Sequence, residues 1–139
     1  MEGLGLELAL GFSAKGYRVF GTTRSSNEIT EFQKHSAAAE IILTFTDITK
    51  EEQVNNWKEQ VRKIINRDGL DLLINNAGIS TPGSMEILSL SAVRHEFEVN
   101  VFGSLATIHA ARPWQPVPDT LVRHLEHMEV ILSGLQLQN

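Results

Sequence analysis

The sequence predicts an α/β protein with a parallel sheet, and two patterns in its 139 residues support this. Helix-like and strand-like segments alternate at the spacing of parallel strands joined by right-handed crossovers. The run Leu70–Ile74 is nearly all apolar, as expected of a parallel strand that is covered on both faces. The predicted order is α-β-α-β-α-β-α, which begins with a helix where a doubly wound sheet would begin with a strand.

The first predicted helix covers residues 3–15, where apolar residues recur at helical spacing and form one stripe: Leu4, Leu8, Ala9 and Phe12. Gly16 follows as a residue that can take a positive φ at the helix end. The β-prone run Tyr17–Thr23 is the first predicted strand. Ser25-Ser26-Asn27 can cap a short second helix that reaches about His35.

The second predicted strand is Ile41–Thr46, and Thr49 with Glu52 forms a capping box for the helix after it. That helix ends near Asp68-Gly69 and has one apolar face: Val54, Trp57, Val61, Ile64 and Ile65. The strand Leu70–Ile74 follows. Residues 86–111 are then predicted to be helical, in one piece or two, after a break at Pro82-Gly83.

Residues 1–111 are therefore predicted to form one partial α/β domain, and residues 112–139 an irregular tail. Three prolines fall within six residues of the tail, at positions 113, 116 and 118. Its later apolar residues have amphipathic, helix-like spacing and give no signal of a parallel strand: Leu121, Leu125, Met128, Ile131 and Leu132.

Composition excludes several classes of function. A net charge of −5 argues against nucleic acid as a partner, because phosphate binding needs clustered Lys and Arg. No apolar run approaches the roughly 18–20 residues needed to span a bilayer. Met1-Glu2 opens no signal peptide, and the absence of cysteine fits a reducing cytoplasm. His124 and His127 have a helical metal-site spacing but no evident third ligand, so no metal site is predicted.

Two short motifs stand at the ends of predicted elements. Gly3-Leu4-Gly5 opens the first helix, and Asn75-Asn76-Ala77-Gly78 directly follows the apolar strand Leu70–Ile74. A lone G-x-G is a weak signal, because helix-entry turns also use it, and Asn and Gly suit an ordinary polar turn. In this order along one chain, the two motifs together favour a nucleotide site.

Three further positions follow the same pattern. Asp47-Ile48 lies just past the second predicted strand, Arg24 closes the first, and Asn100-Val101-Phe102-Gly103 lies in the last helix. Each also has an ordinary structural reading: an Asp that precedes a helix, a solvated surface Arg, and a helical Asn that faces solvent.

Over roughly residues 3–106, these five positions resemble the classical short-chain dehydrogenase/reductase family, with the chain incomplete at both ends. The resemblance implies a Rossmann-type doubly wound parallel sheet that binds a nicotinamide dinucleotide. Gly3-Leu4-Gly5 matches the last part of the fingerprint T-G-x-x-x-G-x-G. There the backbone approaches a pyrophosphate, and the helix N-terminus faces its negative charge.

The resemblance also implies roles for the other positions. Asn75-Asn76-Ala77-Gly78 would stabilise the central sheet and lie along the adenine-ribose, and the carboxylate of Asp47-Ile48 would contact the adenine. Asn100 is the catalytic candidate, because its backbone carbonyl would help to hold a water of the proton relay. Arg24 stands where family members that select NAD carry an acidic residue. The Arg24 guanidinium can bind a 2′-phosphate through two hydrogen bonds, which favours NADP over NAD.

The chain departs from the family where the family's chemistry lies. A Tyr as general acid/base and a Lys four residues on are expected, but the only tyrosine is Tyr17. Ser133 is predicted to have no strand around it, so no role in catalysis is assigned to it. The first strand of the family, which would lie between Tyr17–Thr23 and Leu70–Ile74, should precede Gly3. With those two strands unpaired, we expect poor folding or aggregation through open edges.

Two readings of the tail stay open. The codons of residues 124–128, read one base later, permit a segment similar to the family's fifth strand, so a one-base frameshift near residues 106–111 is one hypothesis. A genuine alternative tail is the other. Two functions follow: an NADP-linked oxidoreductase acting on a small carbonyl or alcohol substrate, inactive as this truncated chain, or a non-catalytic nucleotide-binding or interaction protein. Whether the chain is itself an enzyme is left undecided by the sequence.

Overall fold

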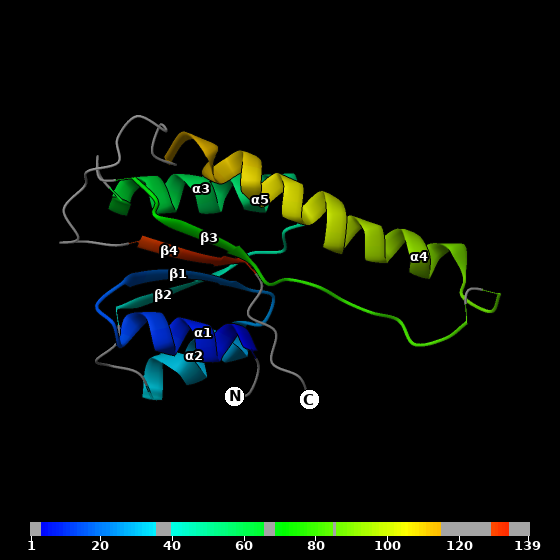
Figure 1. Ribbon diagram of the computed structural model, residues 1–139, viewed down its shortest axis with the longest axis horizontal. Helices are drawn as coiled ribbons and strands as arrows, with labels where there is room; N and C mark the ends of the chain where they lie inside the picture. The colour runs from blue at the N-terminus through cyan, green and yellow to red at the C-terminus, as the bar shows by residue number, and fades with distance from the viewer. Residues whose placement is uncertain (1–3, 36–39, 66–68, 85, 115–128, 134–139) are drawn as a thin grey trace.

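The computed structural model describes residues 4–35, 40–65, 69–84, 86–114 and 129–133. Its centre is a parallel sheet in which four strands have the order β2 (Ile41–Phe45), β1 (Arg18–Thr23), β4 (Glu129–Ser133) and β3 (Leu72–Asn75). Helices cover both faces of the sheet, and one long helical segment extends beyond it (Figure 1). The fold class predicted from the sequence, a doubly wound α/β protein, is therefore confirmed.

The elements keep the predicted alternation, with a further strand at the end. In chain order they are α1 (Leu4–Ser13), β1 (Arg18–Thr23), α2 (Ser26–His35), β2 (Ile41–Phe45), α3 (Glu51–Ile65), β3 (Leu72–Asn75), α4 (Leu90–Phe97), the π-helical η1 (Glu98–Gly103), α5 (Ser104–Ala111), the 3-10 turn η2 (Arg112–Trp114) and β4 (Glu129–Ser133).

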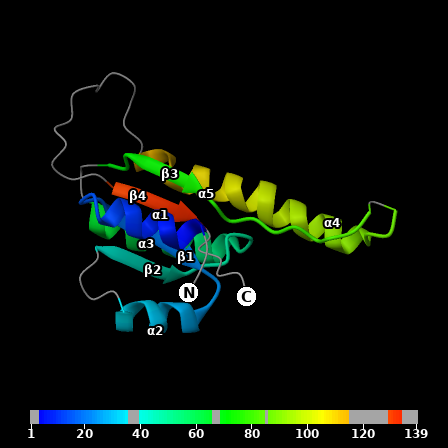
Figure 2. The same cartoon turned by 60° about the horizontal axis from the view of Figure 1, so that its bottom comes forward.

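Successive residues of β1 separate the two faces of the sheet, because side chains alternate along a strand. Val19 packs with Ala9 of α1, and Phe20 packs in the cluster formed by α3 and α5. Figure 2 shows α1 and α2 together on one face, with α3 and α5 on the other. Each face of the sheet thus has its own apolar core.

The larger core lies between α3, α5 and the sheet. Trp57 of α3 is 1% exposed and is the largest side chain in it. The predicted apolar face of α3 contributes most of the remaining members: Val54, Val61, Ile65 and the partly buried Ile64. Leu70 was predicted to start β3, but the strand begins at Leu72, and Leu70 is buried in this core just before it.

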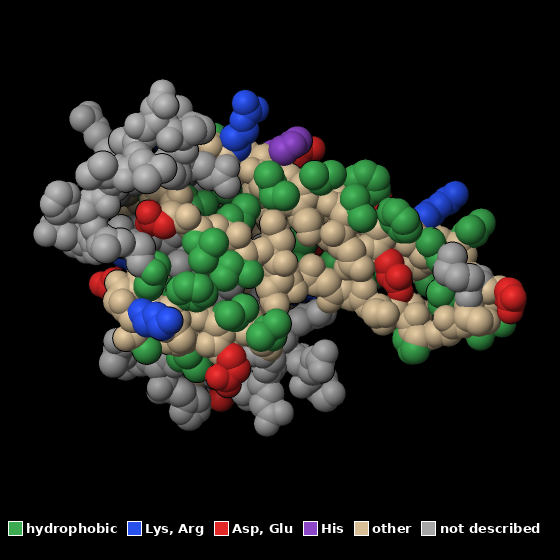
Figure 3. All heavy atoms as spheres, viewed as in Figure 1, with side chains coloured by type: hydrophobic (Ala, Val, Ile, Leu, Met, Phe, Trp, Pro, Cys, Tyr) green, Lys and Arg blue, Asp and Glu red, His purple; other side chains and the backbone are tan. Residues whose placement is uncertain are grey.

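The predicted helix 86–111 is three segments that continue one another. Ser89 caps α4 by accepting a hydrogen bond from the N–H of Ala92, so the helix begins four residues later than predicted. Figure 3 shows exposed apolar side chains gathered along this segment, among them Phe97, Phe102 and Leu105. Its last part, α5, contacts β3 of the sheet and packs against α3.

The prediction of a tail without a parallel strand is wrong. Residues Glu129–Ser133 form β4, which is parallel to β1 on one side and to β3 on the other. The expectation that β1 and β3 have unpaired facing edges is wrong for the same reason, since β4 fills the place between them. Ser133 is also not isolated, because it ends β4 in register with Asn75. The described sheet therefore lacks the unpaired facing edges of β1 and β3 from which poor folding and aggregation were expected.

Candidate functional site

The carboxyl ends of all four strands lie at one edge of the sheet, because the strands are parallel. Arg24 follows β1 at this edge, Asp47 follows β2, and Asn75 ends β3. In open α/β sheets, ligands bind in the crevice outside the carboxyl ends of the strands. The fold therefore brings together residues that the sequence separates by more than fifty positions.

The end of β1 carries a network of hydrogen bonds that the sequence reading missed. The hydroxyl of buried Thr23 donates to the Glu28 carboxylate and accepts the N–H of Ser25 at 3.1 Å. Ser25 in turn accepts the N–H of Glu28 at 3.3 Å, which caps α2. A carboxylate therefore does stand near the end of β1, although the sequence suggested none. The spacing Ser25-x-x-Glu28 is that of a capping box and was the available signal.

Asp47 is held in a tight turn after β2. Its Oδ1 accepts the Thr49 N–H at 3.0 Å and the Thr49 hydroxyl at 2.7 Å, while its own N–H donates to Gln53 at 2.7 Å. Partial burial raises the pKa of the Asp47 carboxyl, but the hydrogen bonds from Thr49 outweigh it, helped by the positive charges of Arg24 and Lys50. The pKa consequently lies below its ordinary value, and Asp47 is ionised at neutral pH.

Thr49→Val is expected to destabilise the protein by about 1 kcal/mol at pH 7, because it removes a hydroxyl bound to a charged group. The folded pKa of Asp47 is lowered, so this stabilisation is present above the ordinary aspartate pKa of about 3.9 and is lost as the pH falls through the folded value. Urea unfolding at pH 7 and near pH 3 measures the difference. Thr30→Val is the control, since the Thr30 hydroxyl donates to a backbone carbonyl. A difference for Thr49→Val that does not shrink in acid would contradict the assignment.

Ile48, predicted to share a binding role with Asp47, lies in the interior instead. It is 5% exposed, and its side chain packs against Gly103 at the end of η1. A Cβ at position 103 would come within 2.7 Å of Ile48 and 3.2 Å of the Glu98 carbonyl oxygen. Gly103 therefore allows η1 and α5 to approach the turn that carries Asp47. Ile48 acts by packing, so of this pair of residues it is Asp47 that offers a polar group at the edge.

Asn75 is linked to α5 through Thr107. The Thr107 hydroxyl, which is fully buried, lies 2.7 Å from Asn75 Oδ1 and 2.8 Å from the Ser104 carbonyl oxygen. Its proton can go to only one of them at a time. Asn75-Asn76-Ala77-Gly78 leads from β3 into an extended segment, as predicted for a motif at the end of the strand.

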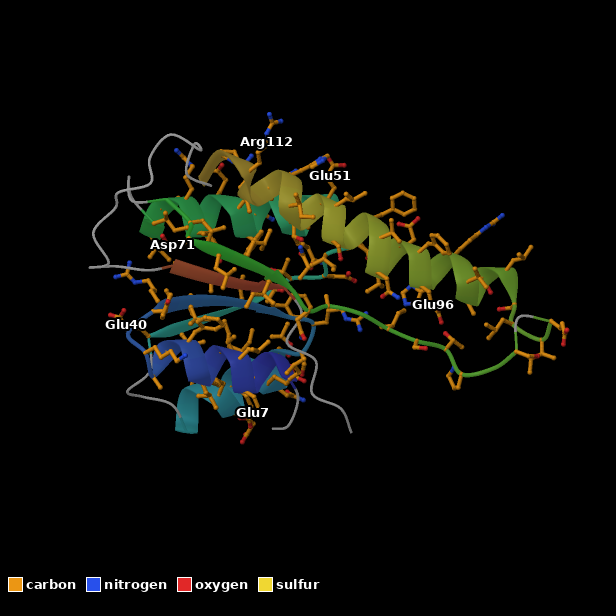
Figure 4. All side chains as sticks on the ribbon, viewed as in Figure 1. Glu7, Glu40, Glu51, Asp71, Glu96 and Arg112 are labelled. Carbon is orange, nitrogen blue, oxygen red and sulfur yellow. The ribbon has the colours of Figure 1, made fainter. Side chains whose placement is uncertain are left out.

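Asn100 fixes that segment through its side chain. Its Oδ1 accepts the N–H of Ile79 and its Nδ2 donates to the carbonyl of the same residue, both at 2.8 Å. The sequence assigned Asn100 a role through its backbone carbonyl, and the structure adds this side-chain clamp. Glu96 makes a second attachment by accepting the N–H of Thr81, which lowers the pKa of its carboxyl (Figure 4).

Of the Gly3-Leu4-Gly5 motif, Gly3 lies outside the described residues. Leu4 and Gly5 begin α1, and Gly5 is buried. The helix α1 leads into β1 and runs in the opposite direction to it, so the N-terminus of α1 lies at the carboxyl edge of the sheet with Arg24, Asp47 and Asn75 (Figure 2). The structure thus brings every described candidate except buried Ile48 toward this edge.

Tyr17 lies away from the site. It directly precedes β1, at the end of that strand away from Arg24. Its ring packs edge-on against the ring of Phe12, with 5.3 Å between the ring centroids. In the part of the chain that the structure describes, no cluster of His, Asp or Glu could hold a metal ion. Nor is any helix in that part long and apolar enough to cross a membrane. His124 and His127 fall outside the described residues.

A parallel sheet with polar residues at its carboxyl edge is typical of the dinucleotide-binding type of α/β protein. Comparison with known proteins makes this specific. The family model described as short chain dehydrogenase matches residues 1–114. The chain belongs to the short-chain dehydrogenase/reductase family.

One relative and two solved structures illustrate the match. The NADPH-dependent 3-dehydrocapnine reductase of Ornithobacterium rhinotracheale is 32% identical over 104 residues, which are 75% of this chain and 36% of that protein. The carbonyl reductase Sniffer of Caenorhabditis elegans superposes with a TM-score of 0.71 at 23% identity, over 81% of this chain and 48% of that one. The structure of NADPH-bound carbonyl reductase from chicken fatty liver superposes with a TM-score of 0.68 at 23% identity, over 81% of this chain and 46% of that one. The chain spans about a third to a half of the length of these three proteins.

Proposed function

We propose that this chain carries the cofactor-binding part of an oxidoreductase that transfers hydride between NADP and a small carbonyl or alcohol substrate. The observation that carries the proposal is the meeting of Arg24, Asp47 and the Asn75–Gly78 segment at the carboxyl edge of a parallel sheet. When bound, the nicotinamide cofactor would accept or supply the hydride. This chain's residues would hold its adenosine half. A cytoplasmic location remains a prediction.

The residues at the end of β1 fit a 2′-phosphate. Arg24 supplies a guanidinium that can bind phosphate through two parallel hydrogen bonds. Glu28 would repel a phosphate, but the Thr23 hydroxyl donates to its carboxylate, which holds that carboxylate at the first turn of α2. The reductase from Ornithobacterium is described as NADPH-dependent, and the chicken carbonyl reductase structure holds NADPH. These features favour NADP over NAD.

Arg24→Gln is expected to weaken NADPH binding tenfold or more and to change NADH binding less than twofold, because only NADPH carries the 2′-phosphate. Isothermal titration with each nucleotide measures both constants. Arg18→Gln is the matched control, since it removes the same charge at the other end of β1, where Arg18 pairs with Glu40 at 3.7 Å. Equal losses for the two nucleotides would overturn the choice of NADP. Absence of binding by the unaltered chain would overturn the proposed cofactor site.

A non-catalytic nucleotide-binding protein is the second candidate, and one observation favours it. The single tyrosine of the sequence packs against Phe12 at the edge of the sheet opposite the site, so it cannot serve there as a general acid. Under this candidate, the chain binds NADPH and does not oxidise it with any of a panel of aldehydes and ketones. Turnover of NADPH by the purified chain would exclude it.

A further inference from the structure

The strand β3 forms one edge of the described sheet, with β4 on one side and no described strand on the other. Its sequence is Leu72-Leu73-Ile74-Asn75, which holds neither a charged residue nor a proline. Natural proteins usually protect an edge strand with such residues, because its free N–H and C=O groups pair with any strand that reaches them. The outer edge of β3 lacks this protection and is therefore open to pairing.

The helix beside this edge is apolar on its outer side. Ala106 and Ala110 line the cavity between α5 and α3, and Thr107 bonds to β3. Because the helix has 3.6 residues per turn, Leu105 and Ile108 point away from α3. These two side chains are 45% and 38% exposed. Figure 2 shows α5 beside β3, so an apolar helix surface adjoins the open strand edge.

The opposite edge of the described sheet lacks this combination. There β2 pairs with β1, and the helix that contacts β2 is α2. The sequence of α2 is mostly polar, and its one aromatic side chain, Phe32, is buried against the sheet. Among the described residues, an open strand edge with an apolar helix surface beside it is therefore found at β3 and not at β2.

We infer that the outer edge of β3 and the outer side of α5 form an interface between two copies of this chain, related by a two-fold axis. The β3 strands of the two copies pair antiparallel, so that the two sheets become one, and the two α5 helices lie side by side over the junction. In a two-fold interface each copy contributes the same surface. This interface goes beyond the proposed function and needs no cofactor.

The charges around the edge favour a second copy in this orientation. Asp71, directly before β3, is the one charged residue between positions 69 and 84 of the sequence. An antiparallel pair keeps the two Asp71 carboxylates at opposite ends of the junction, each beside the uncharged Asn76 end of the other strand. On the helices, Glu98 precedes α5 and Arg112 follows it. The same two-fold axis turns the acidic end of one helix toward the basic end of the other, so opposite charges approach each other in both places.

Analytical ultracentrifugation of the full chain tests the interface. We expect a dimer, and Leu72→Lys is expected to raise its dissociation constant tenfold or more, because a charge on the edge opposes strand pairing. Phe45→Lys is the matched control. It puts the same charge on an exposed apolar residue of β2, at the other edge of the sheet, and is expected to change the constant less than twofold. An unaltered chain that is monomeric up to its solubility limit, an assembly larger than a dimer, or equal effects of the two substitutions would overturn the inference.

Should Leu72→Lys fail to fold, Ile108→Lys replaces it, because lysine suits an exposed helix position. Leu90→Lys is its control, at a position of α4 that is 73% exposed. A dimer weakened tenfold by Ile108→Lys and less than twofold by Leu90→Lys supports the interface. Equal dimer stability in the two variants overturns it.

Single cysteines test the antiparallel pairing directly, because the chain has no cysteine and any disulfide must join two copies. Leu73→Cys and Ile74→Cys, made separately, lie at the middle of β3, where the antiparallel pair brings equivalent residues within the Cα separation that a disulfide allows. Mild oxidation is expected to give a disulfide-linked dimer in at least one of them and none in Phe45→Cys. No link in either β3 variant, with both folded, overturns the pairing.

Discussion

Ile131→Pro is expected to lower the free energy of unfolding by about 3 kcal/mol or more. Ile131 lies between Phe20 of β1 and Leu73 of β3, so its N–H faces a strand whichever way it points. Proline removes that donor and leaves a buried carbonyl unpaired, at a cost of about 1–3 kcal/mol before its ring disturbs the sheet. Domains are stable by only about 5–15 kcal/mol. Urea unfolding followed by circular dichroism measures the change.

Phe45→Pro is the matched control for this prediction. The N–H of Thr46 donates to the Thr23 carbonyl at 2.8 Å, so the N–H of Phe45, one residue earlier, points away from β1. Phe45 is half exposed and lies on β2, which is an edge strand of the described sheet. Its replacement by proline is expected to change stability by about 1 kcal/mol or less. Similar losses in the two variants would mean that residue 131 is not in a central strand.

Much of the fold was predictable because it is encoded locally. The apolar face of α3 has the helical period, and Asp47 and Asn75 follow strands that are recognisable from their own residues. Parallel pairing then follows from the alternation of elements, and it brings these strand ends to one edge. The candidate residues Arg24, Asp47 and Asn75 could therefore be placed together before the structure was known.

The strand β4 could not be predicted in the same way. Leu125, Met128, Ile131 and Leu132 have spacings that also fit a helix, and a five-residue strand gives too short a run to decide. What makes Glu129–Ser133 a strand is the pair of open edges on β1 and β3, which come from residues more than fifty positions earlier in the chain. Its partners, and not its own residues, determine its structure.

Contacts between distant residues explain the other omissions. Asn100 binds Ile79 across 21 positions, and Thr107 reaches Asn75 across 32. Neither spacing is a sequence motif. The side-chain role of Asn100 is visible only when η1 lies beside the segment after β3. Glu28, in contrast, stands in a readable capping box, and its position near Arg24 follows from α2 starting directly after β1.

Trp57→Ala is expected to destabilise the protein by about 3–5 kcal/mol, because it deletes the largest buried side chain and leaves a cavity between α3, α5 and β1. The same core holds α5 against the sheet, and α5 carries Thr107 to Asn75 at the site. The variant is therefore expected to lose NADPH binding as well at temperatures where the unaltered chain binds. Urea unfolding and NADPH titration at 15 and 30 °C measure the two effects.

Phe97→Ala gives the comparison, since it deletes a large aromatic side chain that is 55% exposed on α4, outside both apolar cores. Its expected change in unfolding free energy is about 0.5 kcal/mol or less. A loss for Trp57→Ala no larger than this would show that the contact of α3 with α5 does not support the sheet. Asn75 would then have to be positioned by β3 and β4 alone. A large loss for Trp57→Ala, with NADPH affinity of the folded fraction unchanged at 15 °C, would separate the support of the fold from the geometry of the site.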